Sequence, residues 1–308
     1  MMEKKLATRK IKHDGSIWDI MFSIVNYVGF FIFAIMCIYP FYYLLINTIS
    51  ANDLSNAGRI MAYPMGIHFT NYIEVFKLPG LGRATMVSLG RTVIGTTCSV
   101  VSSAFLGFMF SQQKMWLRRV WYRMLVATMY FNAGLIPMFM TMRNLHLTNN
   151  FLVYIIPVIV QPFNIILVKT YVESIPSSLQ EAAEVDGAGI LTIFAKIIFP
   201  TCTPILATIT IFSAVGQWNA FQDTLIYITD QKLWSLQYLL YTYLNQARSL
   251  AMIMQNVSTE AIADLAKQQT ATSIRMTVSV IVVLPILFVY PFFQRHFVKG
   301  IMIGSVKG

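Results

Sequence analysis

Charged residues are scarce in this chain of 308 residues. Asp, Glu, Lys and Arg together make up 12% of it, whereas 56% of the residues are hydrophobic and the mean hydropathy is +0.61. Soluble globular domains carry about twice that share of charge. The composition therefore excludes an ordinary soluble protein and predicts a chain that lies mostly in a lipid bilayer.

The sequence also lacks the residue patterns that enzymes and metal sites require. Cys37, Cys98 and Cys202 lie in apolar stretches and show no CxxC or Cys/His spacing, so neither a metal site nor a disulfide framework is indicated. No glycine-rich phosphate loop, HExxH or GxSxG occurs. The four histidines, at positions 13, 68, 146 and 296, lie outside the apolar stretches or at their ends. We therefore expect no catalytic residue, no metal and no cofactor, which argues against an intramembrane enzyme.

The excess of basic residues fits a membrane protein better than a nucleic-acid-binding protein. The formal net charge is +10. The Lys and Arg residues occur in short clusters between apolar runs, however, and do not gather on one soluble face. We therefore expect no nucleic acid among the partners.

Six stretches of the sequence are apolar enough to cross a bilayer, which takes about 20 residues of helix. The predicted transmembrane helices are Ile20–Ile46, Met86–Phe110, Trp121–Met142, Phe151–Tyr171, Ile198–Phe221 and Ile274–Phe293. The first is too long for the apolar core of a signal peptide. The third to fifth contain Pro, or clustered Gly and polar residues, and lipid penalises freed backbone groups. We therefore expect these three to be shielded by neighbours or to line a wet cavity.

The distribution of Lys and Arg predicts the orientation. Five lie in the N-terminal segment, four in the link 111–123 and three from Arg295 onward, whereas the three alternate links together hold seven. Both termini should therefore face the cytoplasm. The resulting division is a cytoplasmic N-terminal segment (1–17), an all-α transmembrane domain (18–298) with a cytoplasmic loop (173–199), and a cytoplasmic tail (299–308).

Two predicted extracytoplasmic segments are long. The segment Asn47–Thr85 is rich in Gly, Pro and Asn, and we expect a loop over the outer mouth. The segment Thr224–Gln269 has two helical patterns. Leu236–Leu244 has aliphatic and aromatic residues all round, which is typical of a buried or interfacial helix, and Thr259–Thr270 is rich in helix formers.

The cytoplasmic loop after the fourth span carries helix start and stop signals. Pro176, Ser177 and Gln180 form a start signal, and Gly187 after Asp186 is a stop signal. The predicted helix has two turns, which is too short to be stable alone in water. It has alanines on one side and glutamates on the other, and this arrangement suits docking into a groove of a partner.

This loop resembles a known motif. Glu181-Ala182-Ala183, three residues, Gly187, nine residues, Ile197, one residue and Phe199-Pro200 resemble the EAA loop of ABC importer permeases, with Phe199 where Leu is usual. The resemblance implies that the helix couples the chain to an ATP-binding subunit. The implied coupling residues are Glu181, Ala182, Ala183, Glu184, Asp186 and Gly187. A capped amphipathic surface turn is the alternative.

Other stretches narrow the resemblance to one type of permease. FNAGLIP at 131–137, VGQWNAF at 215–221, IYPFYY at 38–43 and the terminal VKG at 306–308 are similar to MalG-type sugar permeases. They are most similar to the LplC-like branch, which imports complex and uronic-acid oligosaccharides. The resemblance covers nearly the entire chain from the first span to the last residue.

This resemblance implies a type I ABC importer permease with six transmembrane helices in a bacterial cell membrane. Its partners would be a second permease, an ATP-binding subunit dimer, an extracellular solute-binding protein, an oligosaccharide substrate and membrane lipid. The tail with Lys307 and Gly308 would reach between the two ATP-binding subunits. A frayed basic anchor is the alternative for the tail.

Polar residues within the spans are candidates for the substrate path, because lipid-facing amides are costly. Amides can donate to and accept from sugar hydroxyls, and aromatic faces stack on sugar rings. The candidates are Tyr130, Asn132, Gln161, Asn164, Gln217, Trp218 and Asn219. The alternative role for these residues is hydrogen bonding between helices, including those of the partner permease.

Charged groups in or near the spans are few. Arg91 either pairs with an acidic sugar or an acidic group of the binding protein, or it snorkels or makes a structural bond. Asp19, at the start of the first span, is expected at the interface. A secondary transporter would need intramembrane acids, and only Asp19 and Asp223 lie near a span. This scarcity disfavours an ion-coupled transporter.

Overall fold

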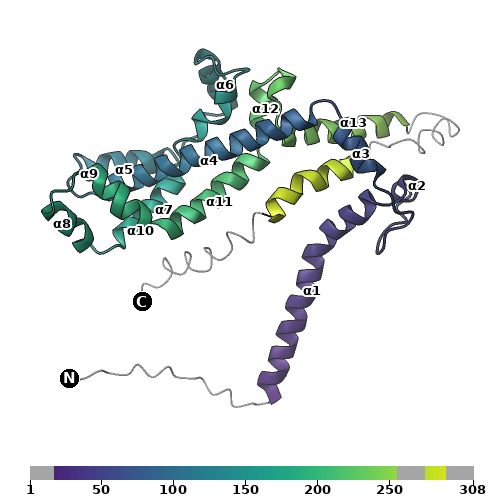
Figure 1. Ribbon diagram of the computed structural model, residues 1–308, viewed down its shortest axis with the longest axis horizontal. Helices are drawn as coiled ribbons and strands as arrows, with labels where there is room; N and C mark the ends of the chain where they lie inside the picture. The colour runs from purple at the N-terminus through teal and green to yellow at the C-terminus, as the bar shows by residue number, and fades with distance from the viewer. Residues whose placement is uncertain (1–16, 255–274, 289–308) are drawn as a thin grey trace.

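The described part of the chain is entirely helical. The computed structural model describes residues 17–254 and 275–288, and every regular element in these ranges is a helix (Figure 1). The all-α prediction is therefore confirmed for this part. The predicted helix Thr259–Thr270 and the tail with Lys307 and Gly308 lie outside the described residues.

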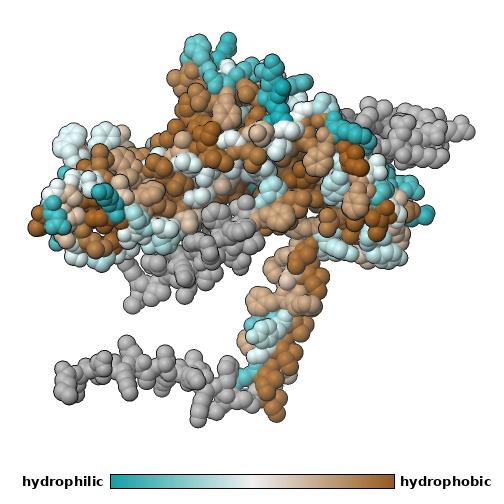
Figure 2. Space-filling model, in the orientation of Figure 1, coloured by the Kyte–Doolittle hydropathy of each residue, from teal (hydrophilic) through white to brown (hydrophobic). Residues whose placement is uncertain are grey.

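The first helix, α1 (Ile17–Thr48), stands away from the rest of the chain (Figure 1). It is long and apolar enough to cross a membrane, and its buried side chains begin only at Ile46. Hydrophobic residues cover most of its visible surface in Figure 2. A helix that is hydrophobic all round needs lipid or another protein around it, so α1 contributes little to the core of this chain.

The centre of the fold is α4 (Leu81–Ser111), against which α7 (Pro162–Glu173) and α11 (Thr203–Asn219) pack (Figure 1). Small residues on α4 allow this packing. At Gly107 an added Cβ would lie 2.7 Å from the Cβ of Val168, so only glycine permits the two backbones to come this close.

Three hydrophobic clusters hold the described helices together, and two of them include α11. The first joins α4, α7 and α11 to α9 (Ile190–Ile193) around Phe108 and Ile209. The second joins α11 to α13 (Leu236–Met254) and to the helix Arg275–Phe288, through Trp218, Leu236 and Val278 among others. The predicted helix at Leu236–Leu244 is thus confirmed, and it extends to Met254.

The third predicted span is not one continuous helix, which corrects the expectation for Trp121–Met142. It consists of α5 (Arg118–Ala127) and α6 (Leu135–Asn144), with a non-helical stretch between them. The Asn132 side chain accepts a hydrogen bond from the Gly134 amide at 2.9 Å, and Gly134 has φ +87°. This local turn competes with helix formation. A hydropathy average over the whole segment does not detect the turn.

The fourth and fifth predicted spans are bent pairs of helices. The short 3₁₀ helices η1 (Phe151–Tyr154) and η2 (Ile156–Val158) meet α7 at 42°. Further along, α9, the π-helical turn η3 (Phe194–Ile198) and α10 (Phe199–Thr201) meet α11 at 79°. By length and composition the described residues therefore contain two membrane-crossing helices, or up to four if each bent pair is one span. The six-helix topology stays a prediction.

The segment Asn47–Thr85 is more ordered than the predicted loop. It contains α2 (Asn52–Asn56) and α3 (Thr70–Lys77), and α4 begins at Leu81. The Asn71 side chain donates to the Thr48 carbonyl at 2.9 Å and to the Asn52 side chain at 2.9 Å. These long-range bonds order a segment whose Gly, Pro and Asn content alone indicates a loop. The remaining short elements are α12 (Gln222–Tyr227) and η4 (Gln231–Leu233).

Candidate functional site

The predicted two-turn helix is present as α8 (Ser178–Val185), at one end of the molecule (Figure 1). Gly187 has φ +80°, its amide donates to the Glu184 carbonyl at 3.0 Å, and the Ala188 amide donates to the Ala183 carbonyl at 2.9 Å. These two bonds form a Schellman motif, whose left-handed position strongly favours glycine. The stop signal is therefore confirmed.

The start of α8 differs from the prediction in one respect. Ser177 makes no side-chain capping bond. The Gln180 side chain, which is part of the predicted start signal, accepts a hydrogen bond from Gln112 at 3.0 Å. The helix begins where predicted, but a contact with a distant segment replaces the local cap.

One face of α8 packs on the protein and the other is open. Ala183 is buried in the cluster around Phe108, whereas Glu181, Ala182, Glu184 and Val185 are exposed. Val185 is 88% exposed, more than any other large hydrophobic side chain among the described residues. The exposed face is thus a short strip of two glutamates, one alanine and one valine.

Side chains of the link between α4 and α5 hold α8 from one side. The Lys114 ammonium lies 2.7 Å from the Glu184 carboxylate, and the Gln112 amide bonds Gln180. A cavity of about 500 Å³ lies between this link, α8 and α9, and Trp116 is one of its lining residues. The link therefore connects α8 mechanically to the C-terminal end of α4.

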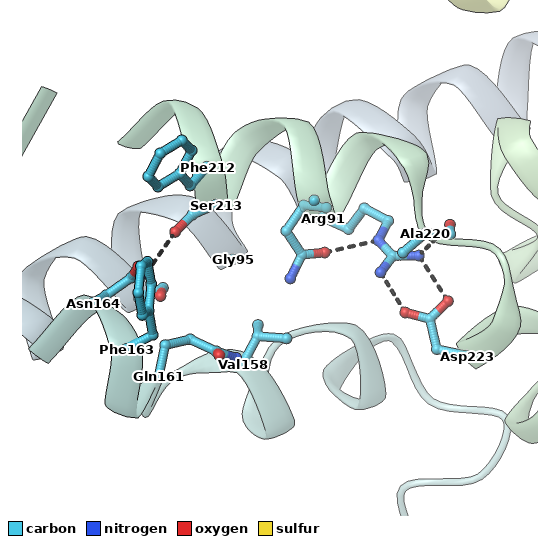
Figure 3. A pocket seen from close by; sticks show the side chains of 13 residues that line it. Arg91, Gly95, Val158, Gln161, Phe163, Asn164, Phe212, Ser213, Ala220 and Asp223 are labelled. Carbon is cyan, nitrogen blue, oxygen red and sulfur yellow. Dashed lines mark hydrogen bonds and ion pairs between the residues drawn. The ribbon is translucent and has the colours of Figure 1, made fainter. Parts of the chain in front are cut away.

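A second cavity, of about 320 Å³, lies between α4, α7 and α11 and is called the central cavity below (Figure 3). Its lining is amphipathic, with aromatic and small residues beside polar groups. The polar side chains from α4 and α11 are Arg91, Ser99, Ser213 and Gln217, and those from the remaining segments are Gln161, Asn164 and Asp223.

Arg91 is the most constrained of these side chains. It is 1% exposed and forms an ion pair with Asp223, in which the Nη1 atom donates to one carboxylate oxygen at 3.0 Å and Nη2 donates to the other. Its Nε atom donates to the Gln217 side chain at 2.9 Å. The guanidinium also lies over the Tyr154 ring, 4.3 Å from its centroid. Arg91 therefore does not snorkel to the outer interface, and it makes the structural bond that was the alternative.

Gly95 and Ser99 shape the wall of this cavity beside Arg91. A Cβ at Gly95 would lie 2.8 Å from the Gln217 side-chain nitrogen, so glycine lets that amide reach Arg91 and the Tyr154 carbonyl. Ser99 is 2% exposed, and its hydroxyl has no hydrogen-bond partner among the described residues. Thr92, Thr96 and Ser103 of α4 also have buried hydroxyls without a partner among the described residues, so Ser99 is distinguished from them only by its place in the cavity wall.

The structure brings together three of the seven predicted path residues: Gln161, Asn164 and Gln217 line the cavity. Trp218 instead packs in the second cluster, and its indole nitrogen donates to the Val282 carbonyl at 3.0 Å. Asn219 is exposed and accepts from Gln237 at 3.1 Å.

The two remaining path candidates lie elsewhere. Tyr130 is 82% exposed, and Asn132 is also exposed, in the stretch between α5 and α6. The shielding expected for this broken span does not come from the described part of this chain.

Sequence reasoning missed Asp223 and Ser99 as cavity residues. Asp223 has a usable signal, since it is an acid at the end of an apolar span that also holds Gln217 and Asn219. Ser99 has none, because serines are frequent along α4 and only the packing shows which one borders a cavity.

Comparisons with known proteins show which chains this one is similar to. Residues 100–303 match the family described as "Binding-protein-dependent transport system inner membrane component". The chain is 31% identical over 293 residues to the "Polygalacturonan/rhamnogalacturonan transport system permease protein YtcP" of Bacillus subtilis, covering 94% of this chain and 99% of that protein. It is also 31% identical to "Protein LplC" of the same organism, covering 88% and 90%.

One solved structure is similar over almost the full length. It is a chain from the "Crystal structure of a bacterial ABC transporter involved in the import of the acidic polysaccharide alginate", with a TM-score of 0.81 and 31% identity. The match covers 92% of this chain and 98% of that chain.

Proposed function

Because this chain belongs to the family of binding-protein-dependent transport system inner membrane components, we propose that it is a permease subunit of an ATP-driven oligosaccharide importer in a bacterial cell membrane. Two similar proteins are named for the transport of polysaccharides, polygalacturonan or rhamnogalacturonan in one case and alginate in the other. Proteins of this kind are transport subunits and not enzymes.

The proposed topology has six transmembrane helices and both termini in the cytoplasm. The N-terminal segment would be 1–17, the transmembrane domain 18–298 and the tail 299–308. The similarity to the alginate transporter chain and the distribution of Lys and Arg support it. On this topology α8 lies in the cytoplasm.

A second permease subunit would complete the translocation path. Two observations support this partner: α1 exposes apolar side chains along most of its length, and the non-helical stretch at Tyr130 and Asn132 is exposed in the isolated chain. Irregular backbone is tolerated at membrane depth only where protein or water covers it. The partner subunit would supply that cover.

The coupling element in this proposal is α8. Ala183 would anchor the helix, and the exposed strip of Glu181, Ala182, Glu184 and Val185 would lie in a groove of an ATP-binding subunit. Asp186 and Gly187 would end the helix so that its outer face stays free. The tail residues Lys307 and Gly308 would make a further contact with the ATP-binding dimer. The single observation that carries the proposal is a short helix with its small residue buried and its acidic face open.

The mechanism follows from these contacts. Closure of the ATP-binding dimer would move α8, and the bonds from Gln180 and Glu184 to the α4–α5 link would pass that movement to α4. The helices around the central cavity would then switch between inward-open and outward-open arrangements. An extracellular binding protein would deliver the sugar.

The substrate path would include the central cavity, with Gln161, Asn164 and Gln217 in its wall. Tyr130, Asn132 and Asn219 are proposed contacts at the surface facing the second permease. Trp218 is buried here and would meet substrate only after a rearrangement of α11.

The test is transport by the reconstituted importer with changes in α8. Glu181→Lys reverses the charge of the exposed face, and Gly187→Trp places a bulky side chain at a left-handed position. Both variants should insert normally but lose ATP-dependent uptake and substrate-stimulated ATP hydrolysis. Glu74→Lys on α3 is the matched control, since Glu74 is another surface acid on a short helix. Normal uptake in both α8 variants would contradict the coupling role.

A further inference from the structure

The central cavity has a size and a lining that fit part of a sugar. Its volume of about 320 Å³ is near the lower end for small-molecule sites, so it holds one ring better than a chain of rings. Phe163, which lines it, is 52% exposed and offers an aromatic face. Figure 3 shows Asn164 and Ser213 at one end and the Arg91–Asp223 pair at the other.

The cavity has no net formal charge. Among the described residues that line it, Arg91 and Asp223 are the ionisable side chains that carry charge at neutral pH, and they are paired with each other. Arg91 is also bonded to Gln217 and to the Ala220 carbonyl at 3.2 Å. A sugar carboxylate in this cavity would be desolvated without a free cation to compensate it, which is costly.

The remaining polar groups suit uncharged hydroxyls. Ser99 lines the cavity, and its buried hydroxyl has no partner among the described residues. The Asn164 amide donates to Ser213 at 3.2 Å, and its oxygen can accept a further bond. Gln161 contributes a second amide. These groups offer donors and acceptors at separate points, as the hydroxyls of a sugar ring require.

We propose that this cavity is a subsite for one uncharged sugar ring of the transported oligosaccharide, and that Asp223 sets this preference by neutralising Arg91. The inference rests on the proposed transport function and deepens it. It assigns to this subunit the recognition of ring hydroxyls, so that any acidic group of the substrate would be recognised elsewhere in the importer. Asp223 is then a specificity-determining residue.

The test compares the uptake of two probes of nearly equal size into proteoliposomes. The proteoliposomes contain the whole importer, purified by an affinity tag on this chain. The probes are trigalacturonate and its fully methyl-esterified, uncharged form. Asp223→Asn keeps an oxygen that can accept from Arg91 but leaves the guanidinium charge uncompensated. The uptake ratio of acid to ester should rise about tenfold in this variant, since an uncompensated cation attracts the carboxylate.

The double variant Arg91→Gln/Asp223→Asn removes both charges and is the matched control. Its uptake ratio should stay within about twofold of the wild-type ratio, because the cavity is again neutral. If uptake depends on ATP but the ratio of acid to ester is the same in wild type and in Asp223→Asn, the proposed charge preference of the cavity is wrong and the proposed transport function stands. Uptake of both probes without ATP would instead contradict the proposed function.

A labelling experiment with the ion pair intact covers the case in which Asp223→Asn does not fold. Ser213→Cys is made in a background without Cys37, Cys98 and Cys202, and is treated with an anionic and a cationic methanethiosulfonate. A neutral cavity predicts the same ratio of the two rates as at an exposed cysteine placed at Tyr63, within about threefold. A preference of about tenfold for the anionic reagent would overturn the proposal.

Discussion

Two of the polar junctions in the described part of the chain differ in burial and in what they connect. At the centre, Arg91 is 1% exposed and holds Asp223, whose side chain is 24% exposed. At the end with α8, the Lys114 and Glu184 side chains are 81% and 45% exposed. The central junction joins α4 to the segment that follows α11, and the outer one joins α8 to the α4–α5 link.

The difference shows which junction holds the fold and which one can move. Breaking a buried ion pair leaves a desolvated charge, and this typically costs several kcal/mol. Breaking an exposed pair costs little, because water solvates both partners. The central junction is therefore a fixed point of the fold, whereas the outer junction can move together with α8 at little cost in stability.

The largest expected effect comes from removing the acid of the central junction. Asp223→Ala leaves Arg91 buried without its counter-ion and should lower the free energy of unfolding by about 3–5 kcal/mol. The measurement is thermal unfolding of the purified importer in detergent. Arg91→Met/Asp223→Ala should recover part of the loss, since no charge is then stranded. A loss no larger than that of Glu74→Ala, which breaks an exposed pair, would contradict the distinction between the junctions.

A smaller effect is expected where α4 meets α7. Gly107→Leu forces a side chain against Val168 and should cost about 1–3 kcal/mol in the same unfolding measurement. Gly82→Leu is the matched control on the same helix, because an added Cβ there has nothing within 4 Å. Equal free energies of unfolding of the two variants would show that the close approach of α4 and α7 does not stabilise the fold.

The smallest effect on stability belongs to the outer junction. Lys114→Ala should change the free energy of unfolding by less than about 1 kcal/mol, as should Lys77→Ala, which breaks another exposed pair. Only Lys114→Ala should lower the uptake per ATP hydrolysed, because it removes a contact of α8, the helix that is proposed to move. The expected decrease is about twofold, which corresponds to an interaction energy of about 0.4 kcal/mol. Identical coupling in both variants would exclude a role of Lys114 in transmission.

Local signals in the sequence predicted α8 well. Its end depends on the conformation of Gly187, which is a property of one residue and its neighbours. The start of α13 at Leu236 was found for a similar reason, since aliphatic and aromatic residues surround the helix. Both features depend on short-range chemistry that a single sequence contains.

Features that depend on distant segments could not be predicted. The Arg91–Asp223 pair joins residues 132 positions apart, and the sequence contains no signal that brings these two together. The break between α5 and α6 was missed for another reason: hydropathy averages over the Asn132–Gly134 turn, which ends the helix. Of the path residues, the three that line the cavity do so because α7 and α11 pack on the same side of α4, and this arrangement is tertiary.

The most direct measurement of the central claim is a photo-crosslink from α8. A photoreactive benzoylphenylalanine at Val185, which is 88% exposed, should form an adduct with the ATP-binding subunit in native membranes. The same group at Tyr63, which is 62% exposed and lies in the predicted extracytoplasmic segment, should form none. An adduct from Tyr63, or none from Val185 in a functional importer, would contradict the account of α8 as the element that the ATP-binding subunit moves.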